Sequence, residues 1–88
     1  MKLVFSDLAW DQYLHWVASD PKISAKLNAL LDECRRTPFK GRGKPEPLKG
    51  DLAGWWSRRL TAEDRLVYRL VGRPPEQALE IAQCRFHY

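Results

Sequence analysis

The residues whose types could do chemistry gather between Lys44 and Leu70 and at the very end of the chain. The first segment reads KPEPLKGDLAGWWSRRLTAEDRLVYRL and holds one isolated carboxylate, Glu46, fixed between two prolines. The final residues, CRFHY, supply His87 and Tyr88 as candidate partners for that carboxylate. Carboxylates and histidines are side chains that move protons in catalysis, while lysines and arginines bind phosphate. The cations of the first segment are Lys44, Lys49, Arg58, Arg59, Arg65 and Arg69.

Positive charge is concentrated in residues 35–73, which hold eleven Lys or Arg and four Asp or Glu, a net charge of +7. Residues 1–34 carry −2 and residues 74–88 carry −1, so the whole chain carries +4. A concentrated basic surface attracts polyanions more strongly than a scattered one. A solvated basic hairpin is the common alternative, because Lys and Arg are frequent on surfaces. Trp55 and Trp56 beside the arginines shift the interpretation toward nucleic acid, since aromatic rings stack on bases.

Length and composition predict a single globular domain over residues 1–88, with 44% hydrophobic and 30% charged residues. Lys2 is followed by only three apolar residues before Ser6, so we expect no signal peptide, and no apolar run is long enough to cross a membrane. Cys34 and Cys84 lie outside any CxxC motif and are interpreted as free buried thiols in a reducing cytoplasm. The cysteines and histidines lack metal-ligand spacing, so we expect no metal and no cofactor.

Two amphipathic helices are expected after a short apolar strand at residues 2–5. Ser6 or Asp7 can cap the first helix, and Asp20 followed by Pro21 is a strong start for the second. Thr37 precedes a proline and ends the second helix. We expect this antiparallel pair to cover a sheet. The predicted apolar faces are Trp10, Tyr13, Leu14 and Val17 in the first helix, and Ile23, Leu27, Leu30, Leu31 and Cys34 in the second.

A long loop over residues 39–51 separates these helices from the strands that follow. A loop of this length in so small a domain is more often functional than idle. Glu46 has little backbone freedom between its two prolines, which is a reasonable way to aim one carboxylate. Pro-Glu-Pro by itself is more typical of a rigid surface turn, so this motif alone does not establish a site.

Residues 55–60 and 65–70 alternate in character at period two and predict a hairpin that turns at residues 61–64. In its second strand Leu66, Tyr68 and Leu70 share one face, which leaves Arg65 and Arg69 on the opposite face. A further strand over residues 78–86, after a turn at residues 72–77, completes a small and mostly antiparallel sheet. The expected fold is therefore α+β, with two N-terminal antiparallel helices packed on a twisted sheet.

The strand pattern at the end of the chain bears on whether His87 and Tyr88 belong to a site. Alternation that runs unbroken through Phe86 would place both residues firmly. A frayed terminal tail is the alternative, since chain ends are commonly poorly ordered. The residues alone favour neither interpretation.

Several short motifs, spread over nearly the whole chain, occur together in one known protein family. They are MKLVFS at the start, Trp10-Asp11-x-Tyr13, Arg35-Arg36-Thr37-Pro38-Phe39, Gly41-x-Gly43-Lys44-Pro45-Glu46-Pro47-Leu48-Lys49, Gly54-x-Trp56-Ser57-Arg58-Arg59, Asp64-Arg65-Leu66-Val67-Tyr68 and Cys84-Arg85-x-His87-Tyr88. Through them the chain resembles the YoeB/Txe toxins of bacterial toxin–antitoxin systems, within the RelE-like superfamily. Any one motif alone would be weak, but together they are specific.

The resemblance implies a ribosome-dependent endoribonuclease that cuts mRNA in the A site of the 70S ribosome without a metal. It also implies a YefM-type antitoxin that silences the toxin, and a homodimer. Carried over by position, Glu46 is the general base and His87 the general acid. Lys49, Arg59 and Arg65 are phosphate-binding and transition-state residues, and Tyr88 contributes to the site from the chain end; Arg58 and Lys44 are further expected RNA contacts. Two departures stand out. Phe86, where the family often has Tyr, leaves the catalytic roles unchanged, and the turn at residues 72–77 looks longer, which could alter contacts with the ribosome or antitoxin.

Two functions of other classes remain as alternatives. One is a non-catalytic module in which the basic hairpin alone binds RNA or the ribosome. The other is a protein-interaction module whose basic groove receives an acidic peptide. Glu46 favours catalysis over both, because a carboxylate among phosphate contacts repels RNA and so needs another reason to be there.

Overall fold

Two helices form one layer of the protein, and short-range signals in the sequence fix where each begins. The computed structural model describes residues 1–87. Helix α1, Asp7–Ser19, begins after Ser6, whose hydroxyl accepts a hydrogen bond from the amide of Ala9 (3.0 Å). Helix α2, Pro21–Arg36, begins after Asp20, whose carboxylate accepts from the amide of Ile23 (3.1 Å). Both caps satisfy amides that have no partner inside the helix, and both were predicted.

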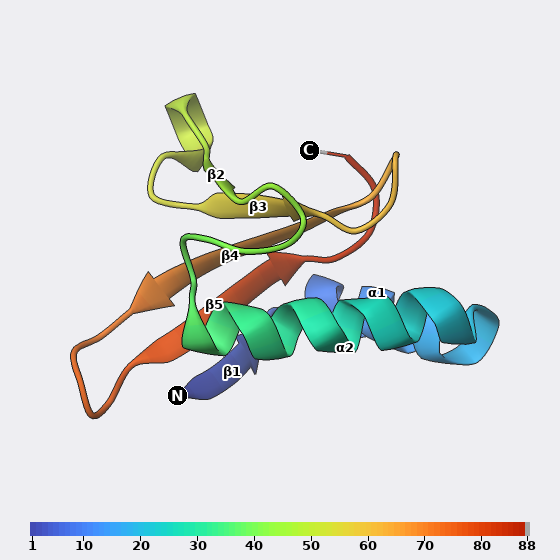
Figure 1. The fold of residues 1–88 in the computed structure, drawn as a ribbon, viewed down its shortest axis with the longest axis horizontal. Helices are drawn as coiled ribbons and strands as arrows, with labels where there is room; N and C mark the ends of the chain where they lie inside the picture. Colours follow the sequence, from blue (N-terminus) through green and yellow to red (C-terminus); the bar gives the residue numbers. More distant parts are fainter. Residues whose placement is uncertain (88) are drawn as a thin grey trace.

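A five-stranded sheet forms the second layer, in the order β1-β5-β4-β3-β2. Strand β1 pairs with β5 in parallel, and the other neighbours are antiparallel. Both helices lie on one side of this sheet (Figure 1). The α+β fold with two helices on a mainly antiparallel sheet is confirmed. The strands are β1 Lys2–Phe5, β2 Glu46–Pro47, β3 Trp56–Arg59, β4 Arg65–Val71 and β5 Ala78–Gln83, and a short 3-10 helix, η1 Gly50–Leu52, lies between β2 and β3.

The predicted apolar face of α2 is confirmed, whereas that of α1 is wrong at three of its four residues; the fourth, Tyr13, is partly buried and packs against the core. Of the α1 residues expected inside, Trp10, Leu14 and Val17 are 47%, 44% and 50% exposed. Helix α1 instead buries Ala9, Gln12 and Trp16. The physical reason lies at Cys84, whose amide donates to the Gln12 side chain (2.8 Å) and whose carbonyl accepts from the Trp16 indole (2.9 Å). These buried backbone groups need partners, and α1 is turned to provide them.

Strand β5 ends at Gln83, three residues earlier than predicted. The ladder with β4 is irregular here, because Val67 pairs with Gln83 while Tyr68 pairs with Ile81, so Ala82 bulges out. Beyond Gln83 the backbone of Cys84 bonds to α1 instead of to a neighbouring strand. The expectation of a strand running through Phe86 is therefore wrong.

The two cysteines are free and buried, as predicted. Burial raises the pKa of the Cys34 thiol to about 11 and that of the Cys84 thiol to about 12. Within residues 1–87, neither helix has the length and apolar character needed to span a membrane.

Candidate functional site

Three of the predicted site residues, Glu46, Arg59 and Arg65, lie on the face of the sheet turned away from the helices. On β4, Leu66 and Tyr68 belong to the core formed with the helices, so Arg65 and Val67 face the other way. Strand pairing then carries this face across the sheet. Glu46 on β2 is opposite Ser57 on β3, and Ser57 is opposite Val67 on β4. Gln83 on β5 completes this row. We call this surface the open face, although Ser57 and Val67 within it are buried, at 1% and 2% exposed.

Two arginines form the next row of the open face. Arg59 on β3 is directly opposite Arg65 on β4, and such partners have Cβ atoms about 5 Å apart. Like charges in this arrangement destabilise a sheet. Neither arginine pairs with a carboxylate among the ion pairs of residues 1–87. A bound anion between them would relieve the repulsion, which makes this pair suitable for a phosphate.

Arg65 is held from one side by the hairpin that precedes it. Its Nη1 atom lies 3.0 Å from the carbonyl of Thr61, 3.3 Å from that of Ala62 and 3.1 Å from that of Asp64. These contacts fix the direction of a long side chain that would otherwise be mobile. Arg65 is half-buried, whereas the side chain of Arg59 is exposed.

The end of the chain is anchored beside Arg65 although it is not a strand. The amide of Phe86 donates to the carboxylate of Asp64 (2.7 Å), and the Phe86 carbonyl accepts from the amide of Arg65 (3.0 Å). Phe86 has a φ of 67°, a left-handed conformation that is uncommon for an aromatic residue and needs such anchors. His87 therefore follows directly on a segment fixed at the start of β4. Tyr88 lies outside the described residues.

Lys44 and Lys49 lie on the chain on either side of Glu46, and all three are exposed. Lys44 has a φ of 56°, and Lys49 directly precedes the 3-10 helix η1. The segment continues its pairing past β2, since the amide of Leu48 donates to the carbonyl of Trp55 (2.9 Å). Edge strand β2 thus carries the carboxylate, and the two lysines flank it on the chain.

Arg58 does not belong to this surface, so the expectation that it binds RNA is wrong. Its side chain is 0% exposed and points to the helix side of β3. Arg58 is ion-paired with Glu33 (2.8 Å) and donates to the hydroxyl of Tyr68 (3.1 Å). The signal was present in the sequence, because Arg58 alternates in phase with the apolar Trp56 and Leu60. Reasoning from charge alone missed it, and missed Glu33 and Tyr68 with it.

The two tryptophans also have different roles. Trp56 packs against Phe39 on the helix side, with ring centroids 4.7 Å apart. Trp55 receives the guanidinium of Arg69, 4.4 Å from its ring centroid, and Arg69 is ion-paired with Glu80 (2.6 Å). Only Trp55 of the pair is therefore placed next to a cation of the open face.

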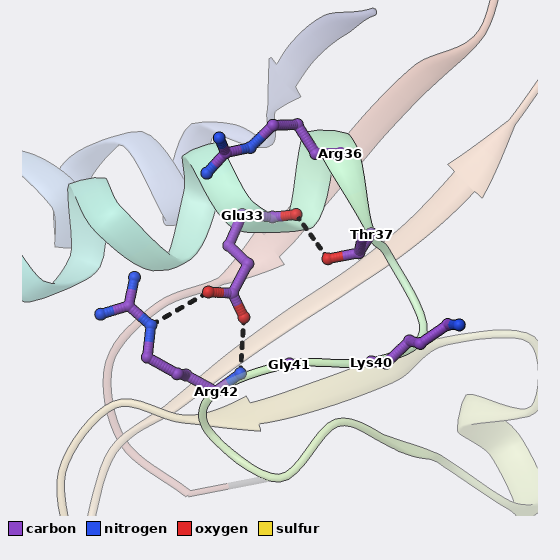
Figure 2. A pocket seen from close by; sticks show the side chains of 6 residues that line it. All are labelled: Glu33, Arg36, Thr37, Lys40, Gly41 and Arg42. Carbon is purple, nitrogen blue, oxygen red and sulfur yellow. Dashed lines mark hydrogen bonds and ion pairs between the residues drawn. The ribbon is translucent and has the colours of Figure 1, made fainter.

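A cavity of about 700 Å³ lies away from the open face, at the end of α2. Glu33, Arg36, Thr37, Lys40, Gly41 and Arg42 line it (Figure 2). Of the predicted catalytic residues that the structure describes, Glu46, Arg65 and His87 do not line this cavity. Within residues 1–87, no three His, Cys, Asp or Glu side chains are grouped to hold a metal ion.

Comparison with known proteins gives a consistent family. Residues 5–88 match the family model described as YoeB-like toxin of bacterial type II toxin-antitoxin system. The chain is 52% identical to Toxin YoeB of Escherichia coli (strain K12) over the full length of both. A solved YoeB/ParE toxin from Agrobacterium tumefaciens is 57% identical, with a TM-score of 0.97 and complete coverage of both chains.

Solved structures of YoeB from Staphylococcus aureus are also similar. One is a YoeB dimer, with 37% identity and a TM-score of 0.88. Another is a heterotetrameric YoeB-YefM toxin-antitoxin complex, with 37% identity and a TM-score of 0.87. In each, all of this chain aligns with 98% of the solved one.

Proposed function

Since the chain belongs to the YoeB-like toxins of bacterial type II toxin-antitoxin systems, we propose that it is a ribosome-dependent mRNA endoribonuclease that needs no metal. Its substrate would be mRNA in the A site of the 70S ribosome, and its action would stop translation in the cytoplasm. The observation that carries the proposal is the open face. There the carboxylate of Glu46 and two arginines, which pair with no carboxylate within residues 1–87, lie on neighbouring strands, and Phe86 is anchored beside one of them.

The reaction follows from the chemistry of RNA, which carries a 2′-OH next to the scissile phosphate. Glu46 takes the proton of this hydroxyl, whose oxygen then attacks the phosphorus. His87 gives a proton to the departing 5′-oxygen. The bond between phosphorus and that oxygen breaks, which leaves a 2′,3′-cyclic phosphate on one fragment and a 5′-OH on the other. Tyr88, next in the chain, is proposed as a further contributor to the site.

Negative charge builds on the phosphoryl oxygens as the attack proceeds. Arg65 and Arg59 lie opposite one another on the same face as Glu46 and would share these oxygens. Lys49, and Lys44 beyond it, would hold the adjoining phosphates of the strand. Cations preorganised in this way stabilise a transition state more than a ground state.

Dependence on the ribosome fits the openness of the face. Glu46, Lys49, Arg59 and His87 are all exposed, so the protein does not enclose an RNA strand by itself. A flexible single strand must be held in a reactive geometry before in-line attack becomes fast. We propose that the ribosome supplies that constraint by holding the mRNA in place.

Two protein partners are part of the proposal. An acidic antitoxin of the YefM type would neutralise residues 35–73, which carry +7, and a disordered segment of it would fold on binding. A second copy of this chain would form a homodimer. Co-expression with the protein encoded next to it should give a stable complex without toxicity. A neighbour that neither binds nor neutralises this chain would refute the antitoxin proposal.

The test of catalysis is primer extension on one mRNA, either naked or on programmed ribosomes. The proposal predicts an extension product that stops at a new 5′ end in the A-site codon only when both ribosomes and the wild-type protein are present. Glu46→Gln should bind the same ribosomes and leave the mRNA intact. Ribosome binding without cleavage by the wild type would instead identify a non-catalytic binding module.

A further inference from the structure

Arg58 is buried and so cannot contact RNA, and its hydrogen bonds indicate another role. We propose that Arg58 is a positioning residue that fixes the loop leading into β2 and thereby places Glu46 on the open face. The inference rests on the proposed function in so far as Glu46 is the base. Its structural part, the placement of Glu46, can be tested without RNA.

The loop between α2 and β2 is wrapped around the guanidinium group of Arg58. Its Nη2 atom donates to the carbonyls of Thr37 (2.6 Å) and Lys40 (2.9 Å), and its Nη1 atom donates to the carbonyl of Arg42 (3.1 Å). Three carbonyls of one short loop thus converge on one side chain. The fixed fork of a guanidinium suits this task, whereas an ammonium group could not reach all three.

Glu33 and Tyr68 hold Arg58 in this orientation from two other elements. Glu33 on α2 neutralises Arg58 and also accepts from the Arg42 side chain (3.0 Å), as Figure 2 shows for the pair of Glu33 and Arg42. On β4, the Tyr68 hydroxyl accepts from Arg58 and donates to the carbonyl of Pro38 (2.6 Å). A buried charge is tolerated only with such partners. The network therefore ties helix, sheet and loop to one group.

Glycines let the loop backbone come this close. Gly41 has a φ of 122°, and a Cβ atom there would lie 1.9 Å from Oε1 of Glu33. Gly43 has a φ of 83°, and a Cβ atom there would lie 3.0 Å from Cβ of Arg58. The Gly43 carbonyl also accepts from the amide of Arg59 (2.6 Å), which docks the loop on β3. Side chains at either position would push the loop off the network.

Glu46 comes three residues after Gly43, on a strand of only two residues. An edge strand of two residues is only weakly fixed by its own pairing with the sheet. The placement of the carboxylate opposite Ser57 therefore depends on how the loop enters β2. Since a misplacement of about 1 Å can slow a reaction roughly a hundredfold, a loosened loop would lower the rate without removing any phosphate contact.

The experiment compares Arg58→Lys and Gly41→Ala with Gly72→Ala in the full chain. Gly72 is a matched control: it has a φ of 81°, and an added Cβ would lie 2.8 Å from the Glu76 carbonyl, in the turn at the other end of β4. Amide hydrogen exchange is measured on the free protein. Single-turnover cleavage and binding are then measured on programmed ribosomes. Gly41→Ala keeps the test decisive if Arg58→Lys does not fold.

The proposal predicts that the amides of Arg42, Leu48 and Arg59 exchange about tenfold faster in both loop variants, the factor expected for roughly one lost hydrogen bond. Amides of β4 and β5 should keep their protection. Cleavage at saturating ribosomes should fall roughly tenfold to a hundredfold with unchanged ribosome affinity. Gly72→Ala should show neither effect.

The proposal is overturned if the loop variants match Gly72→Ala in both measurements, or if all amides lose protection together, since Arg58 would then serve general stability. If the wild type cleaves no mRNA, the proposed function fails alone. The exchange pattern still decides whether Arg58 holds the segment that carries Glu46.

Discussion

Replacing Arg65 by alanine should separate catalysis from stability more sharply than any other single change on the open face. The guanidinium lies opposite Arg59 and is aimed by carbonyls of the preceding hairpin. If it stabilises charge on the phosphoryl oxygens, its loss should slow cleavage on the order of a hundredfold to a thousandfold, or about 3–4 kcal/mol of transition-state stabilisation. Arg59→Ala and Lys49→Ala should act in the same direction and more weakly.

The effect on folding should be much smaller, because two contributions oppose each other. Removing Arg65 loses the contacts of Nη1 with Thr61, Ala62 and Asp64, and a single nitrogen can make at most about two good hydrogen bonds, each worth roughly 0.5–1.5 kcal/mol. It also removes the electrostatic repulsion between Arg65 and Arg59, worth about 0.2–1 kcal/mol. The net destabilisation should be about 1 kcal/mol, a shift of roughly 4–8 °C in the melting temperature.

The assay is single-turnover cleavage of mRNA on programmed ribosomes, with thermal unfolding of the same preparations. Arg73→Ala is the matched control, since it removes one exposed arginine from the turn at the other end of β4. It should cleave at nearly the wild-type rate. If Arg65→Ala also cleaved within about threefold of wild type while folded, the assignment of Arg65 to the transition state would be wrong.

Three further predictions follow from the same structure. His87→Gln should bind ribosomes and antitoxin normally yet cut mRNA orders of magnitude more slowly, because glutamine cannot deliver a proton at neutral pH. Removal of both His87 and Tyr88 should likewise lower activity far more than stability, as single-turnover rates and melting curves would show. Hydrogen bonds from Arg42, first from its amide and then from its side chain, lower the pKa of Glu33 to about 2 from 4.5. The ionised Glu33 carboxylate therefore stabilises the fold above about pH 4.5, and this contribution is lost as the pH falls toward 2. In acid titrations Glu33→Gln should lose less stability over this range than wild type, and parallel curves would refute this. Because burial raises the pKa of the Cys34 and Cys84 thiols to about 11 and 12, alkylation of the native protein at about pH 8 should be slow and should become fast in denaturant; rapid native labelling would contradict the burial.

Local patterns predicted those parts of the fold that local physics decides. The caps at Ser6 and Asp20, the apolar face of α2 and the hairpin at residues 61–64 follow from short-range spacing, and the structure has all of them. Helix α1 was misjudged because Gln12 and Trp16 serve the backbone of Cys84, about seventy residues away. The demand of a distant backbone group cannot be read from helical periodicity.

The candidate site shows the same division. Alternation on β4 correctly turned Arg65 away from the helices, and alternation on β3 would have turned Arg58 inward had it been applied. The pairing of Glu46 with Ser57 could not be predicted, because it depends on the path of a loop that folds around a buried arginine. The anchoring of Phe86 by Asp64 was likewise hidden, since it joins two irregular segments.

The chemistry of the cut ends tests the central claim most directly. Fragments from programmed ribosomes would be purified after a single turnover with wild type and with Glu46→Gln, and their termini identified by enzymatic labelling and mass spectrometry. The account predicts a 2′,3′-cyclic phosphate and a 5′-OH for wild type, with formation of both lost in the variant. Fragments that carry a 3′-OH and a 5′-phosphate, or equal cleavage by Glu46→Gln, would contradict attack by the 2′-OH with Glu46 as its base.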